Sequence, residues 1–236
     1  MTIVCQLTLH WVFLQLFTIP PIWEAFSTWN EPGRLAALRR AAAGVYTEQR
    51  FLIDGWRVHA LSVAIPAGGG VTGVRVLHAG VRRYADTRIH LLYGLRMGKS
   101  VMASAGLGYG KGGPEAELGS VWDVGKSCRF GVQLSMGAEG AGYGGLSLTY
   151  GTGLPLELEL AAGKEAGYPL SGRVQLMYRP VERFVLMGGY AAGPLLPFCG
   201  VGWAAGWWKM GIVGRWHPYL GVSPGIMIGW SGREHK

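Results

Sequence analysis

Charged residues and long apolar runs are both scarce in this chain of 236 residues. Only 15% of the residues are charged, whereas soluble domains average about 25%. The one long apolar run, residues 7–22, is interrupted by polar side chains and by Pro20-Pro21, so it is too short and too broken to cross a bilayer as a helix. We interpret residues 1–27 as an atypical export segment, atypical because no Lys or Arg precedes the apolar run.

Reactive and metal-binding motifs are missing as well. The three cysteines, Cys5, Cys128 and Cys199, are widely separated and form no CxxC pair. The six histidines are dispersed, and the chain holds neither an HExxH nor a G-x-S-x-G motif. We therefore predict no catalytic residue, no metal and no cofactor, and hence a protein that is not an enzyme.

The chain is basic, with a net charge of +8 and a pI near 9.6. Its 22 Lys and Arg residues are scattered rather than gathered into a stripe, which argues against a nucleic-acid partner. Basic rims that face anionic lipid headgroups explain the charge as well. The lipid bilayer and lipopolysaccharide are therefore the expected partners.

What the chain does have is a two-residue alternation, which is clearest in residues 88–97. Apolar side chains occupy every second position there, at Ile89, Leu91, Tyr93, Leu95 and Met97. Because successive side chains of a strand point to opposite faces, this pattern predicts a strand with one apolar and one polar face. Strands of about ten residues with such faces are typical of transmembrane barrels. The alternative is a soluble basic β-protein, whose strands are usually shorter.

The alternation continues to the C-terminus and predicts an all-β fold, a transmembrane antiparallel β-barrel over residues 42–230. We expect about fourteen strands, in a range of twelve to fourteen, because single-chain bacterial barrels have an even number. The loop over residues 110–114 is expected on the extracellular side. The predicted strands are 42–52, 58–65, 71–81, 88–97, 101–109, 115–124, 128–138, 144–151, 156–165, 172–179, 184–191, 198–205, 208–216 and 222–230.

Small and charged residues dominate the polar face, which a barrel would turn toward its lumen. The chain has 40 glycines, many of them inside alternating segments, which fits a crowded concave surface. Its ten Trp and ten Tyr fit aromatic girdles at the two membrane interfaces. Charges on the polar face are expected to pair across the lumen, because an unpaired charge in a narrow pore is costly. The candidate lumen charges are Arg96, Arg129, Glu157, Glu159 and Arg173.

The C-terminal strand is predicted to close the barrel. Prolines and glycines punctuate the segment before it, so we expect a turn over residues 217–220 followed by the last strand. That strand should pair with the first, which would leave no free sheet edge. Trp216 and Trp230 should then lie in opposite interfacial belts.

Two stretches of sequence resemble a known family. Residues 29–36, Trp-Asn-Glu-Pro-Gly-Arg-Leu-Ala, resemble the Asn-Pro-Ala-Gly-Leu-Ala signature near the start of FadL-type and PorV/PorQ-like outer-membrane proteins, although Glu31 and Arg34 depart from it. Residues 216–225 resemble the penultimate turn and last strand of the same group. The signature residues carried over are Asn30, Pro32, Gly33, His217, Pro218, Gly221, Pro224 and Gly225.

The resemblance implies a bacterial outer-membrane barrel whose N-terminal part helps to plug the lumen. Residues 28–41 are then a linker or a plug remnant, and residues 231–236 a C-terminal tail. For function, it implies a PorV/PorQ-type barrel associated with protein secretion or envelope assembly, with secretion-system proteins or exported cargo as partners. The alternative is a FadL-like channel for small hydrophobic compounds. A channel needs a continuous lumen, whereas an interaction barrel needs a filled lumen and extended external loops.

Overall fold

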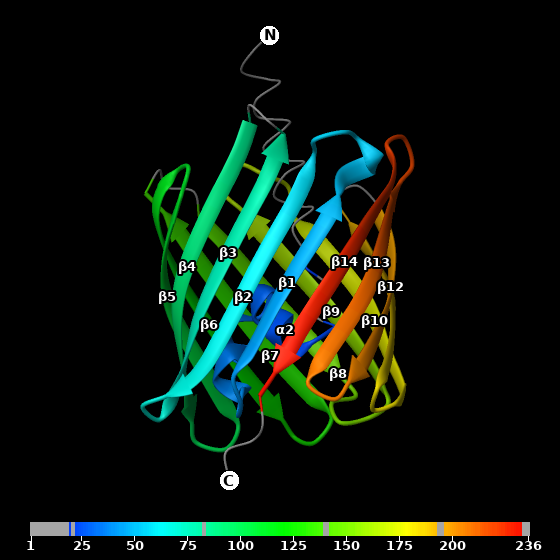
Figure 1. Cartoon of the computed structure of the whole chain (residues 1–236). Helices are drawn as coiled ribbons and strands as arrows, with labels where there is room; N and C mark the ends of the chain where they lie inside the picture. Colours follow the sequence, from blue (N-terminus) through cyan, green and yellow to red (C-terminus); the bar gives the residue numbers. More distant parts are fainter. Residues whose placement is uncertain (1–18, 20–21, 82–83, 139–141, 193–195, 233–236) are drawn as a thin grey trace.

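The protein is a closed barrel of fourteen antiparallel strands (Figure 1). The computed structural model describes residues 19, 22–81, 84–138, 142–192 and 196–232. Each strand pairs with its neighbours in sequence, and β14 pairs with β1. The strands are β1 (Ala42–Gln49), β2 (Arg57–Ala67), β3 (Gly70–Val81), β4 (Tyr84–Met97), β5 (Val101–Gly110), β6 (Gly113–Val124), β7 (Cys128–Gly137), β8 (Gly142–Tyr150), β9 (Leu156–Glu165), β10 (Ser171–Val181), β11 (Phe184–Ala192), β12 (Leu196–Ala205), β13 (Trp208–His217) and β14 (Gly221–Ser231). The predicted fold, strand number and closure are confirmed.

The outer face of the barrel is apolar. Leu91, Tyr93, Leu134 and Leu148 all point outward and are between 40% and 57% exposed, as the alternation predicted. Outward side chains alternate with inward ones along each strand, so nearly all the charge lies on the other face. No helix among the described residues is long and apolar enough to cross a membrane.

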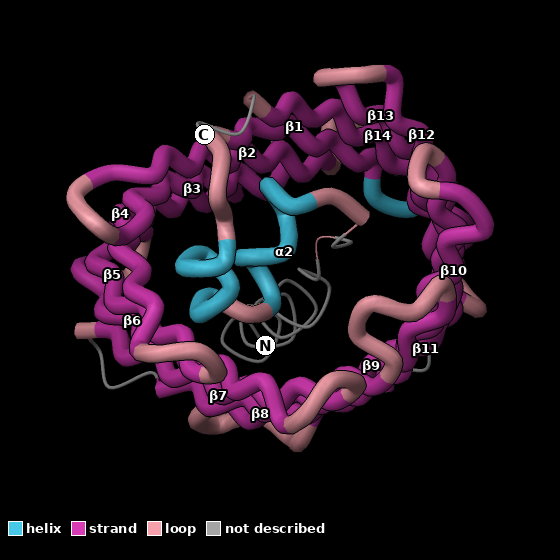
Figure 2. Tube along the Cα trace, turned by 90° about the horizontal axis from the view of Figure 1, so that it is seen from below, coloured by secondary structure: helices cyan, strands magenta, loops and turns pink. Residues whose placement is uncertain are grey.

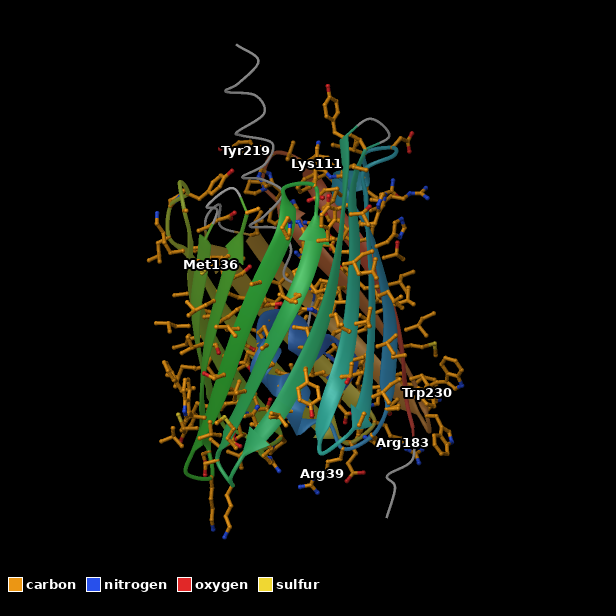
Figure 3. The ribbon with its side chains drawn as sticks, turned by 90° about the vertical axis from the view of Figure 1, so that its left-hand side faces the viewer. Arg39, Lys111, Met136, Arg183, Tyr219 and Trp230 are labelled. Carbon is orange, nitrogen blue, oxygen red and sulfur yellow. The ribbon has the colours of Figure 1, made fainter. Side chains whose placement is uncertain are left out.

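Aromatic side chains mark the two ends of the apolar face. We call the end that carries Lys111 and Tyr219 the upper end, and the opposite end, near Arg39 and Arg183, the lower end (Figure 3). Trp230 points outward near the lower end and pairs across strands with Trp208. Trp216 is exposed at the other end of β13, where it pairs with Val222. The two tryptophans therefore lie in opposite belts, as predicted.

Two strand connections differ from the predictions. The expected long loop over residues 110–114 is a turn of Lys111 and Gly112 alone, because β5 and β6 remain paired to Gly110 and Gly113. The first strand ends at Gln49 rather than continuing to Leu52. A 3₁₀ turn, η2 (Arg50–Leu52), follows it, and Phe51 adopts a left-handed φ of 51° there. The backbone N–H of Phe51 donates to Ser223 Oγ at 2.8 Å, so a side chain of β14 holds this turn.

The N-terminal segment lies inside the barrel. Helix α2 (Glu24–Asn30) and the 3₁₀ helix η1 (Pro32–Ala37) are enclosed by the ring of strands (Figure 2) and occupy the lower half of the lumen (Figure 1). Most of the predicted export segment, residues 1–18, 20 and 21, lies outside the described residues, as do residues 233–236 of the predicted tail. We refer to residues 22–37 as the plug.

Candidate functional site

The plug is anchored to one wall of the lumen by apolar contacts. Phe26, which is fully buried, packs in a core cluster with Trp23 of the plug and with Tyr46 and Met227 of the wall. Gly44 of β1 makes room for the Phe26 ring, since a Cβ at this position would lie 2.6 Å from it. The cluster fills the lumen beside β1–β3 and β10–β14. On this side of the barrel the lumen is therefore filled by packed apolar side chains.

A second anchor holds η1 against the lumen wall formed by β2, β3 and β4. Leu35 is buried with Leu92 of β4 and with residues of β2 and β3. The backbone of Gly33 approaches β6 so closely that a Cβ on Gly119 would lie 2.7 Å from the Gly33 nitrogen. Only glycine fits at such a contact.

Two ion pairs of Glu24 also attach the start of α2 to the barrel. The Glu24 carboxylate lies 3.0 Å from an Arg40 guanidinium nitrogen and 3.4 Å from Lys209 Nζ of β13. Burial raises the pKa of Glu24, but the hydrogen bond from Arg40 and the charges of Lys209 and Arg40 outweigh burial and hold that pKa below its ordinary value. Glu24 is therefore a carboxylate at neutral pH, and its contacts with Arg40 and Lys209 are ion pairs.

A cavity of about 570 Å³ lies in the lumen between the plug and the wall, lined by described residues. It extends from Lys111 at the upper end down to Trp29, Asn30 and Glu31 of the plug, which form its floor. Strands β3, β4 and β6–β11 supply its walls. Inward glycines such as Gly145 and Gly163 make one wall thin, and the Tyr143 side chain lies against both, because a Cβ on either would meet its ring or hydroxyl within 3 Å.

A charged network stands where the plug meets β3 and β6. The Arg75 guanidinium pairs with the Glu117 carboxylate, donates to the Thr28 carbonyl at 2.8 Å, and lies 5.1 Å from the centre of the Trp29 ring. Glu117 also accepts a hydrogen bond of 2.8 Å from Gln133. Arg75 thus joins the barrel wall to the plug.

Other charged side chains around the cavity, those of Arg88 and His90, also lie beside carboxylates, whereas no ion pair is seen for the cavity-lining Lys111 and Glu165 among the described residues. Arg88 Nε lies 2.9 Å from Asp86, and His90 Nε2 lies 3.3 Å from Glu115. On the plug, Glu31 accepts a hydrogen bond from Ser147. The cavity therefore presents mostly neutralised charge, and no group of side chains within the described ranges has the makings of a metal site.

The predicted lumen charges lie on the inner face but do not form one cluster. Glu159 pairs with Arg173, and both are buried. Glu157 pairs at 3.1 Å with Arg179, which the prediction did not name as its partner. Arg129 was expected near these carboxylates, but it pairs at 3.1 Å with Asp123 instead.

The reason lies in the strand register. Asp123 and Arg129 are direct cross-strand partners on β6 and β7, whereas Glu157 is on β9, two strands from Arg129. Arg96 stands exposed near the lower end of β4. Only Arg173 of the five predicted charges borders the cavity.

The signature residues fall at two places. Asn30, Pro32 and Gly33 belong to the plug, where the Asn30 amide donates to the Ile19 carbonyl at 3.1 Å. The other five lie at the upper end of β13 and along β14: His217, Pro218, Gly221, Pro224 and Gly225.

The C-terminal set shapes a turn and a close contact. His217 Nδ1 accepts from the backbone N–H groups of Tyr219 and Leu220 at 3.2 Å each, which closes the turn that Pro218 begins. Gly221 adopts a φ of +86°. Gly225 gives room to Tyr46, whose hydroxyl would lie 2.8 Å from a Cβ there. These residues therefore support the barrel seam and do not touch the cavity.

Sequence reasoning missed Arg75 and the floor residue Trp29 as parts of the site. Arg75 is the single arginine of the valine-rich β3 and lies between Val74 and Val76, and that isolation was a signal in the sequence. Its partner on β6 is 42 positions away in the sequence, so no local pattern could have named it.

No protein-family model matches the chain, and no curated protein matches it. Several solved barrels are similar to it in fold. The Ralstonia pickettii toluene transporter TbuX aligns with a TM-score of 0.66 at 8% identity, over 89% of this chain and 94% of that one. The CymD monoaromatic hydrocarbon channel aligns at 0.63 and 11% identity, over 92% and 96%. Omp33 of Acinetobacter baumannii aligns at 0.58 and 8% identity, over 82% and 99%.

At these identities the likeness concerns the fold. The strand number, the closure and the apolar outer face agree with it. The chain is therefore a fourteen-stranded β-barrel of the bacterial outer-membrane type, as the sequence predicted.

Proposed function

We propose that this protein is an outer-membrane channel for small hydrophobic compounds. The observation that carries the proposal is the cavity of about 570 Å³ that opens along the inside of a closed barrel and ends on the Trp29 floor. Pockets for small molecules usually have volumes of this order. The fold likeness to a toluene transporter and a monoaromatic hydrocarbon channel supports the same function.

The charge pattern of the cavity favours an uncharged cargo. Arg75, Arg88 and Arg173 are each paired with a carboxylate, so a charged solute would find no free counter-charge among them. Two further charged lining residues, Lys111 and Glu165, lie toward the upper end of the barrel. Trp29, Leu77 and Tyr143 offer apolar surface on the floor and walls. A small aromatic or aliphatic molecule meets these surfaces without displacing an ion pair.

The membrane orientation follows from the connections. In bacterial barrels the periplasmic turns are short and the extracellular loops longer. The connection at 50–56 at the upper end has seven residues, whereas the lower-end connections have between two residues, as at Glu182-Arg183, and five, at 151–155. We assign the upper end to the outside, so that cargo enters the cavity from there. Passage past the floor then requires α2 and η1 to shift.

The secretion-associated function, which the family resemblance in the sequence predicted first, receives less support. A barrel that acts as a docking partner needs an extended external loop surface, but Lys111-Gly112 is a two-residue turn at the upper end. The lumen also contains a cavity beside the plug. No catalytic step is part of the proposal.

The test is uptake of radiolabelled toluene by cells that contain the barrel. Ser135→Trp places a large side chain in the cavity, whereas Met136→Trp places the same side chain on the lipid face of the same strand, where Met136 points outward (Figure 3). Ser135→Trp should reduce uptake to the level of cells without the barrel, and Met136→Trp should leave it unchanged. Equal uptake by both variants and the wild type would refute the proposal.

A further inference from the structure

The apolar outer face has a polar interruption on four adjacent strands. Thr47 of β1, His59 of β2, His78 of β3 and Thr87 of β4 are direct cross-strand partners, so they form one continuous row. All four side chains point outward, and both imidazoles are exposed. Polar side chains on a lipid-facing surface carry a cost that falls only near the interfaces, so a row of four calls for an explanation.

The side chains of the row are held in place by one another. His59 Nδ1 lies 3.0 Å from Thr47 Oγ1, and His78 Nδ1 lies 2.8 Å from Thr87 Oγ1. The two imidazole rings lie side by side, with centroids 6.3 Å apart and planes 22° apart. Because each Nδ1 is engaged with a threonine, the Nε2 atoms of both rings are left for a ligand at the barrel surface.

The row marks the upper edge of the apolar face. Below it, the outward residues of β2 are Leu61, Val63 and Ile65, and those of β4 begin with Ile89 and Leu91. Above it, Arg57 faces outward two positions before His59, and its neighbour on β3 is Gly80, which has no side chain. The row and Arg57 therefore stand where the lipid chains end and the headgroups begin.

The formal charge at this place is the positive charge of Arg57, and the two imidazoles add N–H donors beside it. The acidic side chains of the four strands, Glu48 and Asp86, are on the inward-facing positions. No acidic residue in the described parts of β1–β4 faces outward. A guanidinium and two imidazoles on an otherwise apolar surface suit an anion that is itself attached to acyl chains.

We propose that Arg57, His59 and His78 form a binding site for a phosphate group of lipopolysaccharide, with the acyl chains of the lipid lying on the apolar surface below. Arg57 contacts the phosphate as a fork of N–H donors, and the Nε2 atoms of the two histidines donate from the side. Thr47 and Thr87 are positioning residues that fix the two rings. The site is separate from the lumen cavity and places the β1–β4 wall against the outer leaflet, with the upper end outside.

The test measures binding of deep-rough lipopolysaccharide to the full-length barrel in detergent by native mass spectrometry. The comparison ligands are the same lipid after enzymatic removal of its phosphates, and phosphatidylethanolamine. The wild type should bind the phosphorylated form about tenfold more tightly than the dephosphorylated form, because charge-assisted hydrogen bonds are lost with the phosphates. Equal affinity for both forms would overturn the proposal without any variant.

The variants locate the site. His59→Leu and Arg57→Gln, each alone, should reduce the preference for the phosphorylated form, and the triple variant with His78→Leu should abolish it. The matched control is Lys164→Gln, which removes a basic side chain near the upper end of β9, on another part of the wall. An equal loss with Lys164→Gln, an unchanged preference in the variants, or displacement of the lipid by micromolar inorganic phosphate would contradict a lipid-phosphate site here.

Discussion

Thr47 of β1 and Ile226 of β14 lie directly opposite each other across the seam that closes the barrel. Both are outward positions, with Val45 and Ile228 as the next outward pair along the seam. The pairing continues from Ala42 to Glu48, so the first and last strands are joined along nearly the whole of β1. No strand edge is left for pairing with another chain.

A disulfide cross-link checks this register. In a background with the native cysteines replaced by serine, Thr47→Cys with Ile226→Cys should cross-link readily under mild oxidation, because facing residues of paired strands lie within disulfide reach. Thr47→Cys with Ile212→Cys is the control. Ile212 faces Ile226 from β13, which puts it about 10 Å from Thr47. Comparable cross-linking of both pairs would show that the seam is not in this register.

The lipid face can be tested at two neighbouring residues of β7. Leu134 points outward and is 51% exposed, whereas Gln133 points into the lumen and donates to Glu117. Leu134→Arg should lower the free energy of unfolding in lipid vesicles by about 2–4 kcal/mol, the cost of a basic side chain near the bilayer midplane. Gln133→Arg should be tolerated, since it adds a cation beside a carboxylate. Equal losses would mean that the faces are assigned wrongly.

Gly44 tests whether the plug is held by close packing. A Val side chain at this position collides with Phe26, because the Cβ alone would lie 2.6 Å from the ring. We expect Gly44→Val to displace α2, to expose the plug to protease added to detergent-solubilised barrel, and to raise ion conductance in planar bilayers. Gly214→Val is the matched control, since a Cβ there has no neighbour within 4 Å among the described residues. If the Gly44→Val barrel resists the protease and its ion conductance stays at the wild-type level, this result contradicts the packing argument.

The buried pair of Arg173 and Glu159 makes a prediction about stability. Removing one partner leaves an uncompensated buried charge, so Arg173→Met should cost about 3–5 kcal/mol. The double variant Arg173→Met/Glu159→Gln should recover a large part of that loss, because neither charge remains. Urea unfolding followed by the gel shift between folded and heated barrel measures both. A double variant that is as unstable as the sum of the single variants would show that the pair does not interact.

The strands were predictable from sequence because alternation is a local property. From Ile89 to Met97 the residue type indicates the face of each side chain, with the exception of Leu92, which is apolar but buried inside the barrel against Leu35. The end of β1 was not predictable in this way. Phe51 looks like a strand residue, but its backbone N–H is held by Ser223, 172 positions away, which turns the chain out of the sheet.

The site was less predictable than the fold. Alternation placed Glu157 and Arg129 correctly on the inner face. It does not show how far along the barrel axis a residue lies or which residue faces it on the next strand, so the partners Arg179 and Asp123 were missed. The plug helix is seven residues long and is stabilised by the lumen wall around Phe26 rather than by its own sequence. The family resemblance implied a plug remnant over residues 28–41, but the extension of the plug to α2 and the floor of the cavity at Trp29 followed only from the three-dimensional structure.

The most direct test of the channel proposal is a crystal structure of the barrel soaked with bromobenzene, read at the bromine absorption edge. The account predicts an anomalous bromine peak inside the cavity, above Trp29 and beside Tyr143, because this space lies on the path of the cargo. The Ser135→Trp variant should lose that peak. Bromine found only on the outer lipid face, with the cavity empty in the wild type, would contradict the claim that small hydrophobic compounds enter the lumen.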